Sequence, residues 1–393
     1  MKILQVHARY REEGGEDAVV CSERELLGAA GHDVVTHLVR NPSGAAAAGA
    51  SLAMSPWNFL AAREVRDIAE RLRPDVAHVH NTWYALSPSV IAALAGAAIP
   101  VVMTLHNYRL LCVNAQLFRD GAPCEDCVGS HPWHGVRHRC YRGSVLASTA
   151  AATTVALNRR RRTWERHIAV FLATTEFAKE RFVAGGLPGD RIQVKPHSIP
   201  DPGRRTVPPS ASRTILYVGR LSREKGLSVL IDAFAGVVDT DLELLVIGDG
   251  PDRTALQRQA GPRVRFAGRL EPPEVRDEMR RARALAFPSL SFETFGMSVA
   301  EAMAAGLPVI ASDLGGTAEI VGDRAARVVA PGDVAAWTTA LRGLADTAFV
   351  DEAGKAGRQR WEQRFSPAAV LPMLEAAYHQ AMSSSDGASV RAT

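Results

Sequence analysis

Short runs of apolar residues, many of them β-branched, alternate along the chain with longer segments whose apolar residues recur at helical spacing. In the first half, the runs that predict strands are residues 2–8, 33–39, 75–81, 100–107, 169–175 and 192–198. Several of them are apolar almost throughout, as is typical of parallel strands covered on both faces. Intervening segments such as 16–31 have helical spacing and end at glycine. The alternation therefore predicts stacked βαβ units and a doubly wound parallel sheet.

The alternation stops at residues 199–212, a segment rich in Pro, Ser and Arg that predicts a linker between domains. It restarts in the second half, where strands are predicted at residues 214–220, 242–250, 263–269, 284–289, 307–312 and 326–330. We therefore expect an α/β protein with two Rossmann-like, doubly wound domains, 1–198 and 213–364, that face each other across a cleft. The spacing over 365–382 predicts a closing amphipathic helix that packs back on the N-terminal domain, and 383–393 has the composition of a disordered tail.

Length and composition support this organisation and narrow the location of the protein. At 393 residues the chain is longer than one hydrophobic core usually supports. The longest apolar run, 90–105, is interrupted by Pro100 and is shorter than the roughly 20 residues needed to span a bilayer. The N-terminus lacks the apolar core of a signal peptide. We therefore expect a cytoplasmic protein.

The net charge of +4 is too small to indicate a protein that binds nucleic acid. Part of that charge is concentrated in Arg159–Arg162. Such a cluster is compatible with peripheral contact with anionic lipid head groups at the inner face of the membrane, or with an anionic lipid-linked acceptor. The alternative is the solvated end of a helix.

Two glutamates follow a predicted strand of the second half. Glu293 lies in the loop after strand 284–289, and Glu301 lies on an early turn of the helix that comes next. Ligands of open α/β sheets bind beyond the carboxyl ends of the strands, so both carboxylates would point into the cleft. The intervening amides, at 294–297, would form a helix N-terminus, which favours a phosphate group. The alternative is a loop acid and a solvated helix residue.

The other strand ends of this half carry glycines and cations. These residues are Gly219, Arg220, Lys225, Gly248, Gly250, Gly268 and Arg269. Two cations beside flexible glycines suit a diphosphate, and a glycine turn lets the backbone approach a ligand. Each loop alone is also compatible with basic surface residues, but four successive strand ends of this kind favour a binding site.

The segments YVGRLSREKG, VIGDGP, FAGRL and ETFGMSVAEAMAAGLPVIAS resemble the retaining GT-B glycosyltransferases of glycosyltransferase family 4. The resemblance covers about residues 214–330 and, more weakly, 1–198, where EGGEDAVV is similar to the family's glycine-rich first loop. It implies the GT-B architecture, with an acceptor-binding N-terminal domain and a C-terminal domain that binds a nucleotide-diphosphate sugar. It also implies transfer of the sugar to a hydroxyl acceptor (a glycan, a lipid-linked molecule or a small molecule), with retention at the anomeric carbon.

The resemblance also implies roles for the strand-end residues. Arg220 and Lys225 are expected on the diphosphate. Glu301 is expected on the ribose, and Glu293 on the hydroxyls of the donor sugar. Phosphate and sugar contacts are expected from the amides of Thr294, Phe295, Gly296 and Met297, and contacts near the base from Gly268, Arg269 and Leu270. Fixed cations and N–H groups stabilise the negative charge of a leaving phosphate, so we expect the chemistry to require no cofactor and no metal ion.

The first strand of the N-terminal half ends before Gly14 and Gly15, which would let the backbone approach the donor phosphate or the acceptor. Glu16 would cap the following helix or contact a sugar; a plain helix N-terminus with favourably placed acids is the alternative. His106 follows the fourth strand, where the family often has a histidine that reaches the sugar from the opposite domain. A structural histidine is the alternative. The choice between front-face substitution and a covalent intermediate stays open.

A long polar insert, at about 108–143, contains four of the five cysteines. They are Cys112, Cys124, Cys127 and Cys140, in the spacing C-x11-C-x2-C-x12-C. Four thiolates suit a structural Zn²⁺ that would organise the loop, and disulfides are rare in a cytoplasmic chain. Unligated thiols and an iron–sulfur or redox site are the alternatives, and His131, His134 and His138 are rival ligands. We expect the insert to shape the acceptor pocket.

Two other functions fit the same architecture. A nucleotide-sugar epimerase would convert the donor without any acceptor, and a non-catalytic protein would retain only the nucleotide-sugar pocket. The intact set of cations and carboxylates argues against the non-catalytic protein.

Overall fold

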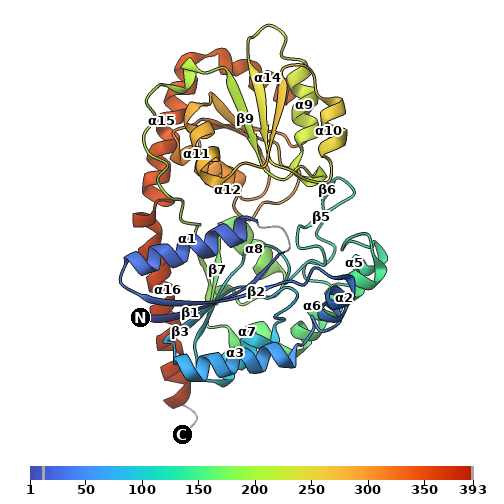
Figure 1. Ribbon diagram of the computed structural model, residues 1–393, viewed down its shortest axis with the longest axis vertical. Coiled ribbons are helices and arrows are strands. Elements are labelled where there is room, and N and C mark those ends of the chain that lie inside the picture. Colours follow the sequence, from blue (N-terminus) through green and yellow to red (C-terminus); the bar gives the residue numbers. More distant parts are fainter. Residues whose placement is uncertain (11–13, 391–393) are drawn as a thin grey trace. The chain divides into compact units, whose positions relative to one another are not determined.

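The computed structural model describes residues 1–10 and 14–390, with the backbone alone at residues 45 and 385–390. It divides into two compact units, and each has its own six-stranded parallel sheet (Figure 1). Unit 1 comprises residues 1–117, 125–198 and the chain from Val370 on, and unit 2 comprises 118–124 and 199–369. Among the described residues, no helix is long and apolar enough to cross a membrane.

The sheet of unit 1 has the strand order β2-β1-β3-β4-β7-β8, with every pair parallel. The strands are β1 (Lys2–Arg9), β2 (Asp33–Arg40), β3 (Val76–Asn81), β4 (Val101–Thr104), β7 (Val170–Ala173) and β8 (Ile192–Val194). β3, β4 and β7 are buried at every position, as expected of apolar runs in a parallel sheet. The strand order changes direction between β1 and β3, and open sheets bind ligands at such a switch point.

The helices of unit 1 connect these strands. They are α1 (Gly15–Ala29), α2 (Ala45–Ala53), α3 (Phe59–Leu72), α4 (Ser89–Gly96), α5 (His134–Arg137), α6 (Val145–Arg161), α7 (Thr163–His167) and α8 (Glu176–Ala184). Asn58 begins α3 and Ser144 begins α6, and each side-chain oxygen accepts a backbone N–H of the first turn. A short hairpin, β5 (Phe118–Arg119) and β6 (Ala122–Pro123), lies in the segment that belongs to unit 2.

The sheet of unit 2 has the strand order β11-β10-β9-β12-β13-β14, again all parallel. Its strands are β9 (Thr214–Val218), β10 (Glu243–Ile247), β11 (Val264–Gly268), β12 (Ala284–Phe287), β13 (Val309–Ser312) and β14 (Ala326–Val329). Its helices are α9 (Leu227–Ala235), α10 (Arg253–Gln259), α11 (Pro272–Arg281), α12 (Met297–Ala304), α13 (Thr317–Val321), α14 (Val334–Arg342) and α15 (Thr347–Arg364). Trp361 and Trp337 belong to separate core clusters, each of which includes sheet residues.

The switch point of this second sheet lies between β9 and β12, where its order changes direction. The loops that follow these two strands carry Lys225 and Glu293. The predicted fold class, an α/β protein with two doubly wound parallel sheets, is confirmed.

The last helix, α16 (Pro367–Val390), differs from its predicted limits because it continues past residue 382 into the segment expected to be a disordered tail. Leu374, Ala377 and Tyr378 pack in the core of unit 1, so this part of the helix is held in place by tertiary contacts. Extending an anchored helix adds one backbone hydrogen bond per residue without a new nucleation step, which explains the extra turns. The hydroxyls of Ser383 and Ser384 also donate to carbonyls one turn earlier. Residues 391–393 lie outside the described part of the chain.

Candidate functional site

A half-buried ion pair lies at the switch point of unit 2. Lys225 ends a short 3₁₀ turn after β9, and its Nζ is 2.6 Å from Oε1 of Glu293, which follows β12. The same Oε1 accepts a hydrogen bond of 2.7 Å from the hydroxyl of Ser289. The side chains remain 28% and 14% exposed, so solvent or a ligand can reach both charges. The structure thus joins the cation and the carboxylate that the sequence placed on neighbouring strand ends.

The loop that carries Lys225 is held against the end of β12 by its backbone. Gly226 has φ +67°, and a Cβ built there would lie 1.9 Å from the carbonyl oxygen of Pro288. Leu290 N–H donates to the Glu224 carbonyl at 2.8 Å, which ties the two loops together from the other side. Any residue other than glycine at position 226 would therefore push the two halves of the ion pair apart.

The remaining glycines bring three strand ends into close contact. Gly248, after β10, has φ +137°, and a Cβ there would lie 1.9 Å from the Gly219 carbonyl oxygen, which follows β9. Gly248 N–H donates to the carbonyl of Gly268 at the end of β11. Gly250 lies against the backbone of Leu221. The predicted glycines therefore form one packed backbone surface beside the ion pair.

The other predicted residues of unit 2 lie after the same strands, in the segments that follow β9, β11 and β12. Arg220 and Arg269 are exposed, and Leu270 packs against the core. Phe295 is buried edge-on against Phe365, and Gly296 precedes the first helical residue, Met297. Thr294 is half-buried in the same loop.

Glu301 lies on the second turn of α12 and does not join the ion pair of Lys225 and Glu293. Burial raises the pKa of this carboxyl, and the charge of Arg276 on α11 opposes the rise. A carboxyl group in either protonation state can form a hydrogen bond with a hydroxyl group.

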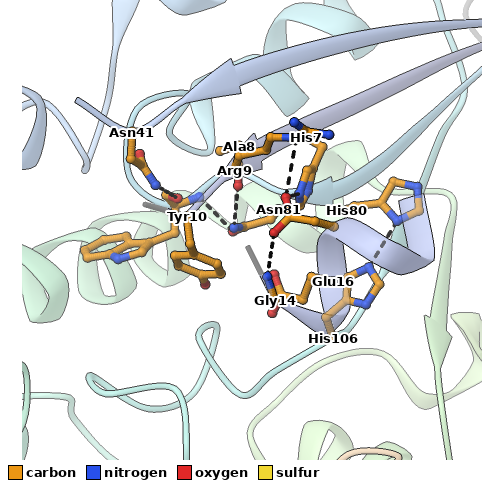
Figure 2. A network of polar contacts seen from close by, with 12 residues as sticks. His7, Ala8, Arg9, Tyr10, Gly14, Glu16, Asn41, His80, Asn81 and His106 are labelled. Carbon is orange, nitrogen blue, oxygen red and sulfur yellow. Dashed lines mark hydrogen bonds and ion pairs between the residues drawn. The ribbon is translucent and has the colours of Figure 1, made fainter. Parts of the chain in front are cut away.

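A row of buried histidines occupies the strand ends of unit 1. His106 follows β4, and its Nε2 is 3.0 Å from Nδ1 of His80 at the end of β3 (Figure 2). The His106 ring stacks between His80, at a centroid distance of 5.3 Å, and His197, at 5.2 Å. The histidine that the sequence suggested is thus fixed on both faces by two further histidines.

The loop from β1 to α1 brings an acidic turn to the same region, with residues 11–13 outside the described chain. Asp17 accepts the Gly14 N–H at 2.9 Å and lies 3.0 Å from Nε2 of His7. Burial alone would raise the pKa of Asp17, but these two hydrogen bonds and nearby positive charge hold it below its usual value. Gly15, the first residue of α1, follows directly.

Glu16 is the second acid of this turn. Its Oε1 accepts a hydrogen bond of 2.5 Å from the amide of Asn107, next to His106. Burial raises its pKa. Among the described residues, its Oε2 has no hydrogen-bond partner. Glu16 therefore contacts the segment that follows β4 through one of its two carboxylate oxygens.

Behind His80 lies a buried ion pair that the sequence did not indicate. The ammonium of Lys195, after β8, contacts Oε1 of Glu23 on α1, and both side chains are 1% exposed. Oε2 of Glu23 is 3.6 Å from Nδ1 of His78 and 3.8 Å from Nε2 of His80. Within the described residues, Glu23, His78 and His80 are the one group with the spacing of metal ligands. Lys195 already supplies this carboxylate with positive charge, which disfavours a cation there.

The only trace of this group in the sequence is the placement of polar residues inside apolar strands. His78 and His80 alternate along β3, which is otherwise apolar up to Asn81, and Lys195 directly follows β8. Such residues require buried partners, but the sequence does not say which residues those partners are.

Among the described residues, the four cysteines of the insert form no disulfide and no group with metal-ligand spacing. Sγ of Cys112 lies 2.9 Å from Oδ1 of Asn114, whereas Cys127 Sγ points to the Pro132 carbonyl at 4.0 Å. Arg159 holds this loop, because its guanidinium donates to the carbonyls of Ser130 at 2.5 Å and Cys127 at 3.4 Å. Arg159, on α6, therefore supports the conformation of the insert.

A pocket opens at the ends of β3 and β4. Its polar lining includes His80, Asn81, His106, Asn107 and Arg109. The guanidinium of Arg109 lies 4.6 Å from the centre of the Trp83 ring and 4.9 Å from that of Tyr141. The imidazole, amide and guanidinium groups of this lining can form hydrogen bonds with a hydroxyl group.

Comparison with known families matches both units. Residues 13–201 match the family described as Glycosyltransferase Family 4, and residues 212–347 match the family described as Glycosyl transferases group 1. The 2-deoxystreptamine glucosyltransferase of Streptomyces kanamyceticus is 29% identical over 77% of this chain and 76% of that protein. The phosphatidyl-myo-inositol mannosyltransferase of Mycobacterium leprae is 32% identical over 52% of this chain, and the match spans 59% of that protein.

Solved structures share the fold. The sucrose-phosphate synthase of Thermosynechococcus elongatus superposes with a TM-score of 0.70 at 19% identity, over 98% of this chain and 99% of that one. Anabaena HepE in complex with UDP-glucose superposes with a TM-score of 0.68 at 17% identity, over 98% and 100%. At these identities the likeness extends to the architecture of the two sheets.

Proposed function

The chain belongs to the group 1 and family 4 glycosyltransferases, and on that basis we propose that it transfers a sugar from a nucleotide-diphosphate sugar to a hydroxyl acceptor, with retention at the anomeric carbon. The observation that carries the proposal is the ion pair of Lys225 and Glu293 at the switch point of unit 2. A doubly wound sheet binds nucleotides at that point. The complex of HepE with UDP-glucose, a protein of the same fold, supports the donor class.

The negative charge that develops on the leaving group during sugar transfer explains why a cation is expected at the switch point of unit 2. As the bond between the anomeric carbon and the phosphate oxygen breaks, its electron pair stays on the nucleoside diphosphate. The acceptor oxygen forms the new bond to carbon, and the proton of its hydroxyl group passes to the nucleoside diphosphate. Lys225 and Arg220 would stabilise that growing negative charge, which makes their effect larger in the transition state than in the ground state. Because these cations are fixed in the chain, transfer is expected to persist when the assay contains a chelator.

The carboxylates take binding roles in this proposal. Glu293 would accept hydrogen bonds from the donor sugar, and Ser289 holds its Oε1 in place. Glu301, whose pKa is raised by burial, would bind the ribose hydroxyls. The backbone surface of the strand-end glycines would let phosphate and base approach closely. The pocket of His106 and Asn107 in unit 1 would receive hydroxyl groups of the sugar or the acceptor.

Purified protein incubated with a panel of nucleotide sugars, with and without hydroxyl acceptors, tests the function. We expect slow acceptor-independent hydrolysis of one donor, and faster consumption of the same donor when a suitable acceptor is present. Conversion of a donor into an epimer without acceptor would identify an epimerase. Donor binding with neither hydrolysis nor transfer would identify a non-catalytic protein.

We also propose that the protein binds its acceptor at the surface of an anionic membrane. Residues 127–164 contain no acidic residue and six arginines besides Arg159, whose guanidinium is used inside the fold. Within this stretch, Trp133 is 45% exposed and Leu146 is 83% exposed. Arginines beside exposed apolar side chains are typical of surfaces that bind anionic lipid bilayers.

Sedimentation with lipid vesicles tests this contact. Binding is expected with vesicles that contain phosphatidylglycerol, to weaken with salt, and to be lost with pure phosphatidylcholine. Leu146→Asp should reduce binding, whereas Val238→Asp, at a position 67% exposed in unit 2, serves as the matched control. Equal binding to both kinds of vesicle, or no binding to either, would rule the proposal out.

Structural zinc at Cys112, Cys124, Cys127 and Cys140 is a separate proposal, which rests on four cysteines in one insert; because they do not have the spacing of metal ligands in the described structure, binding would have to draw their thiols together. Because this insert has few core residues, a bound metal would contribute to its folding. Metal analysis of protein purified without chelators should find about one equivalent of zinc. Less than about half an equivalent of zinc or iron would contradict a structural metal site.

A further inference from the structure

Four side chains form a continuous buried series that leads from the interior of unit 1 to His106. Lys195 contacts Oε1 of Glu23, and Oε2 of the same carboxylate faces Nε2 of His80 at 3.8 Å. Nδ1 of His80 then contacts Nε2 of His106 at 3.0 Å, as Figure 2 shows for the two rings. Every member of the series is at least nine-tenths buried. The two ring nitrogens of His80 thus face two different partners.

The contact between the two imidazoles needs one donor and one acceptor. Burial, together with the surrounding positive charge, lowers the pKa of both His80 and His106 well below the usual value. Both rings are therefore neutral, and each carries its proton on one nitrogen only. In one arrangement, Nδ1 of His80 donates to Nε2 of His106, and the proton of His106 is then on its Nδ1. In the other arrangement, Nε2 of His106 donates to Nδ1 of His80, and Nδ1 of His106 then carries a lone pair.

The carboxylate of Glu23 decides between these two arrangements. Burial alone would raise the pKa of Glu23, but Lys195 and the neighbouring histidines hold it below its usual value, so the group is an anion. Oε2 of Glu23 and Nε2 of His80 each lack another hydrogen-bond partner among the described residues. A lone pair on Nε2 would repel the carboxylate, whereas an N–H on Nε2 is attracted to it. His80 therefore carries its proton on Nε2.

We propose that Glu23 and His80 set the tautomer of His106. With its proton on Nε2, His80 accepts at Nδ1, so His106 donates from Nε2 and presents Nδ1 as a hydrogen-bond acceptor. His80 is then a positioning residue, which acts on substrate only through His106. Only one part of the inference rests on the proposed function, namely that the hydroxyl group which donates to Nδ1 of His106 belongs to the donor sugar or to the acceptor.

Nuclear magnetic resonance of the full-length protein with ¹⁵N-labelled histidine tests the tautomer directly. Long-range ¹H–¹⁵N correlations distinguish a protonated from an unprotonated ring nitrogen, and the spectrum of His106→Gln assigns the signals. We expect His106 and His80 each to carry the proton on Nε2. A proton on Nδ1 of His106 overturns the proposal. A metal ion bound between Glu23 and His80 would produce that result, because it would occupy Nε2 of His80 and place its proton on Nδ1.

Two variants of His80 separate positioning from packing. The amide of His80→Asn occupies the place of Nδ1 and can accept from His106, whereas the amide of His80→Gln occupies the place of Nε2 and reaches only toward Glu23. We expect the Asn variant to keep a kcat at least about tenfold above that of the Gln variant, with similar KM for the donor. A Gln variant as active as, or more active than, the Asn variant would show that His80 acts through Glu23 as a structural residue.

The double variant Glu23→Gln with Lys195→Met provides a test that leaves His80 in place. It removes both buried charges together, so no charge is left unpaired. Without the carboxylate, nothing selects the proton position on His80, and the spectrum of His106 should show both tautomers. A spectrum identical to the wild type would contradict the role of Glu23. Because the spectra require no substrate, they decide the inference even if no donor is turned over and the proposed function fails.

Discussion

Replacing Lys225 with alanine is expected to lower kcat for sugar transfer by about 10²–10³-fold, because it removes a fixed cation aimed at the leaving phosphate. The structure supports this choice among the basic residues of unit 2, since Lys225 is paired with Glu293 at the switch point of the sheet. The change in kcat is obtained from initial rates at a saturating concentration of the donor. That donor is the one identified with the panel of nucleotide sugars. Circular dichroism of the variant should match the wild type, because the side chain is 28% exposed.

The matched control is Arg223→Ala, two residues earlier in the same 3₁₀ turn, where the side chain is exposed. It should change kcat by less than about threefold, as is usual for exposed charges. Glu293→Ala is expected to lower transfer as strongly as Lys225→Ala. The double variant should cost little more than either change alone, because residues that act as a unit are not additive. Turnover near that of the wild type in both single variants would contradict the assignment of the site.

Replacing Lys195 with methionine is expected to lower the free energy of unfolding of unit 1 by about 3–5 kcal/mol. The change leaves the carboxylate of Glu23 buried at 1% exposure without its ammonium partner, and an unpaired charge in the interior is far costlier than a missing pair. Amide hydrogen exchange of peptides from β1, β3 and α1 measures the loss within unit 1 alone. Peptides from unit 2 serve as the internal control.

Adding Glu23→Gln to this variant should recover most of the lost stability, because the pair is then replaced by two neutral side chains. The dependence on pH follows from the charge that remains in Lys195→Met. Without the ammonium, burial raises the pKa of Glu23 above its unfolded value, so the folded state binds the proton more tightly. The stability deficit should therefore be smaller at about pH 5 than at about pH 8. A deficit that grows toward low pH, or no recovery in the double variant, would contradict the assignment of a buried ion pair.

Much of the candidate site of unit 2 could be predicted because each of its segments is a short sequence pattern at the end of a strand. Each strand end of unit 2 carries its own signal, such as Gly248 after β10 or Glu293 after β12, and the topology of a parallel sheet brings all these ends to one edge. The structure added what the sequence could not supply. It shows that Lys225 pairs with Glu293 and not with Glu301, and that Gly226 and Gly248 are required by contacts with distant backbone.

The predicted limit of the last helix was wrong for a different reason. The extent of α16 depends on the packing of Leu374 and Tyr378 in the core of unit 1, and the sequence of residues 383–390 does not indicate that packing.

In the sequence, Arg159 belongs to a basic cluster, but in the structure its guanidinium donates hydrogen bonds to the carbonyls of Ser130 and Cys127. Charge clustering identifies a surface only for the arginines whose donors are not used inside the fold.

The amino-acid sequence determines the two sheets, the order of their elements and the residues at the strand ends, because apolar periodicity and turn residues act over a few positions. The buried series from Lys195 through Glu23 and His80 to His106 has no such local pattern. Its members come from α1, from β3 and from the segments that follow β8 and β4, and Lys195 and Glu23 are 172 residues apart. A buried charge or imidazole must find a partner, but the partner is fixed only by the packing of the folded unit. For that reason the tautomer proposed for His106 depends on three-dimensional contacts alone.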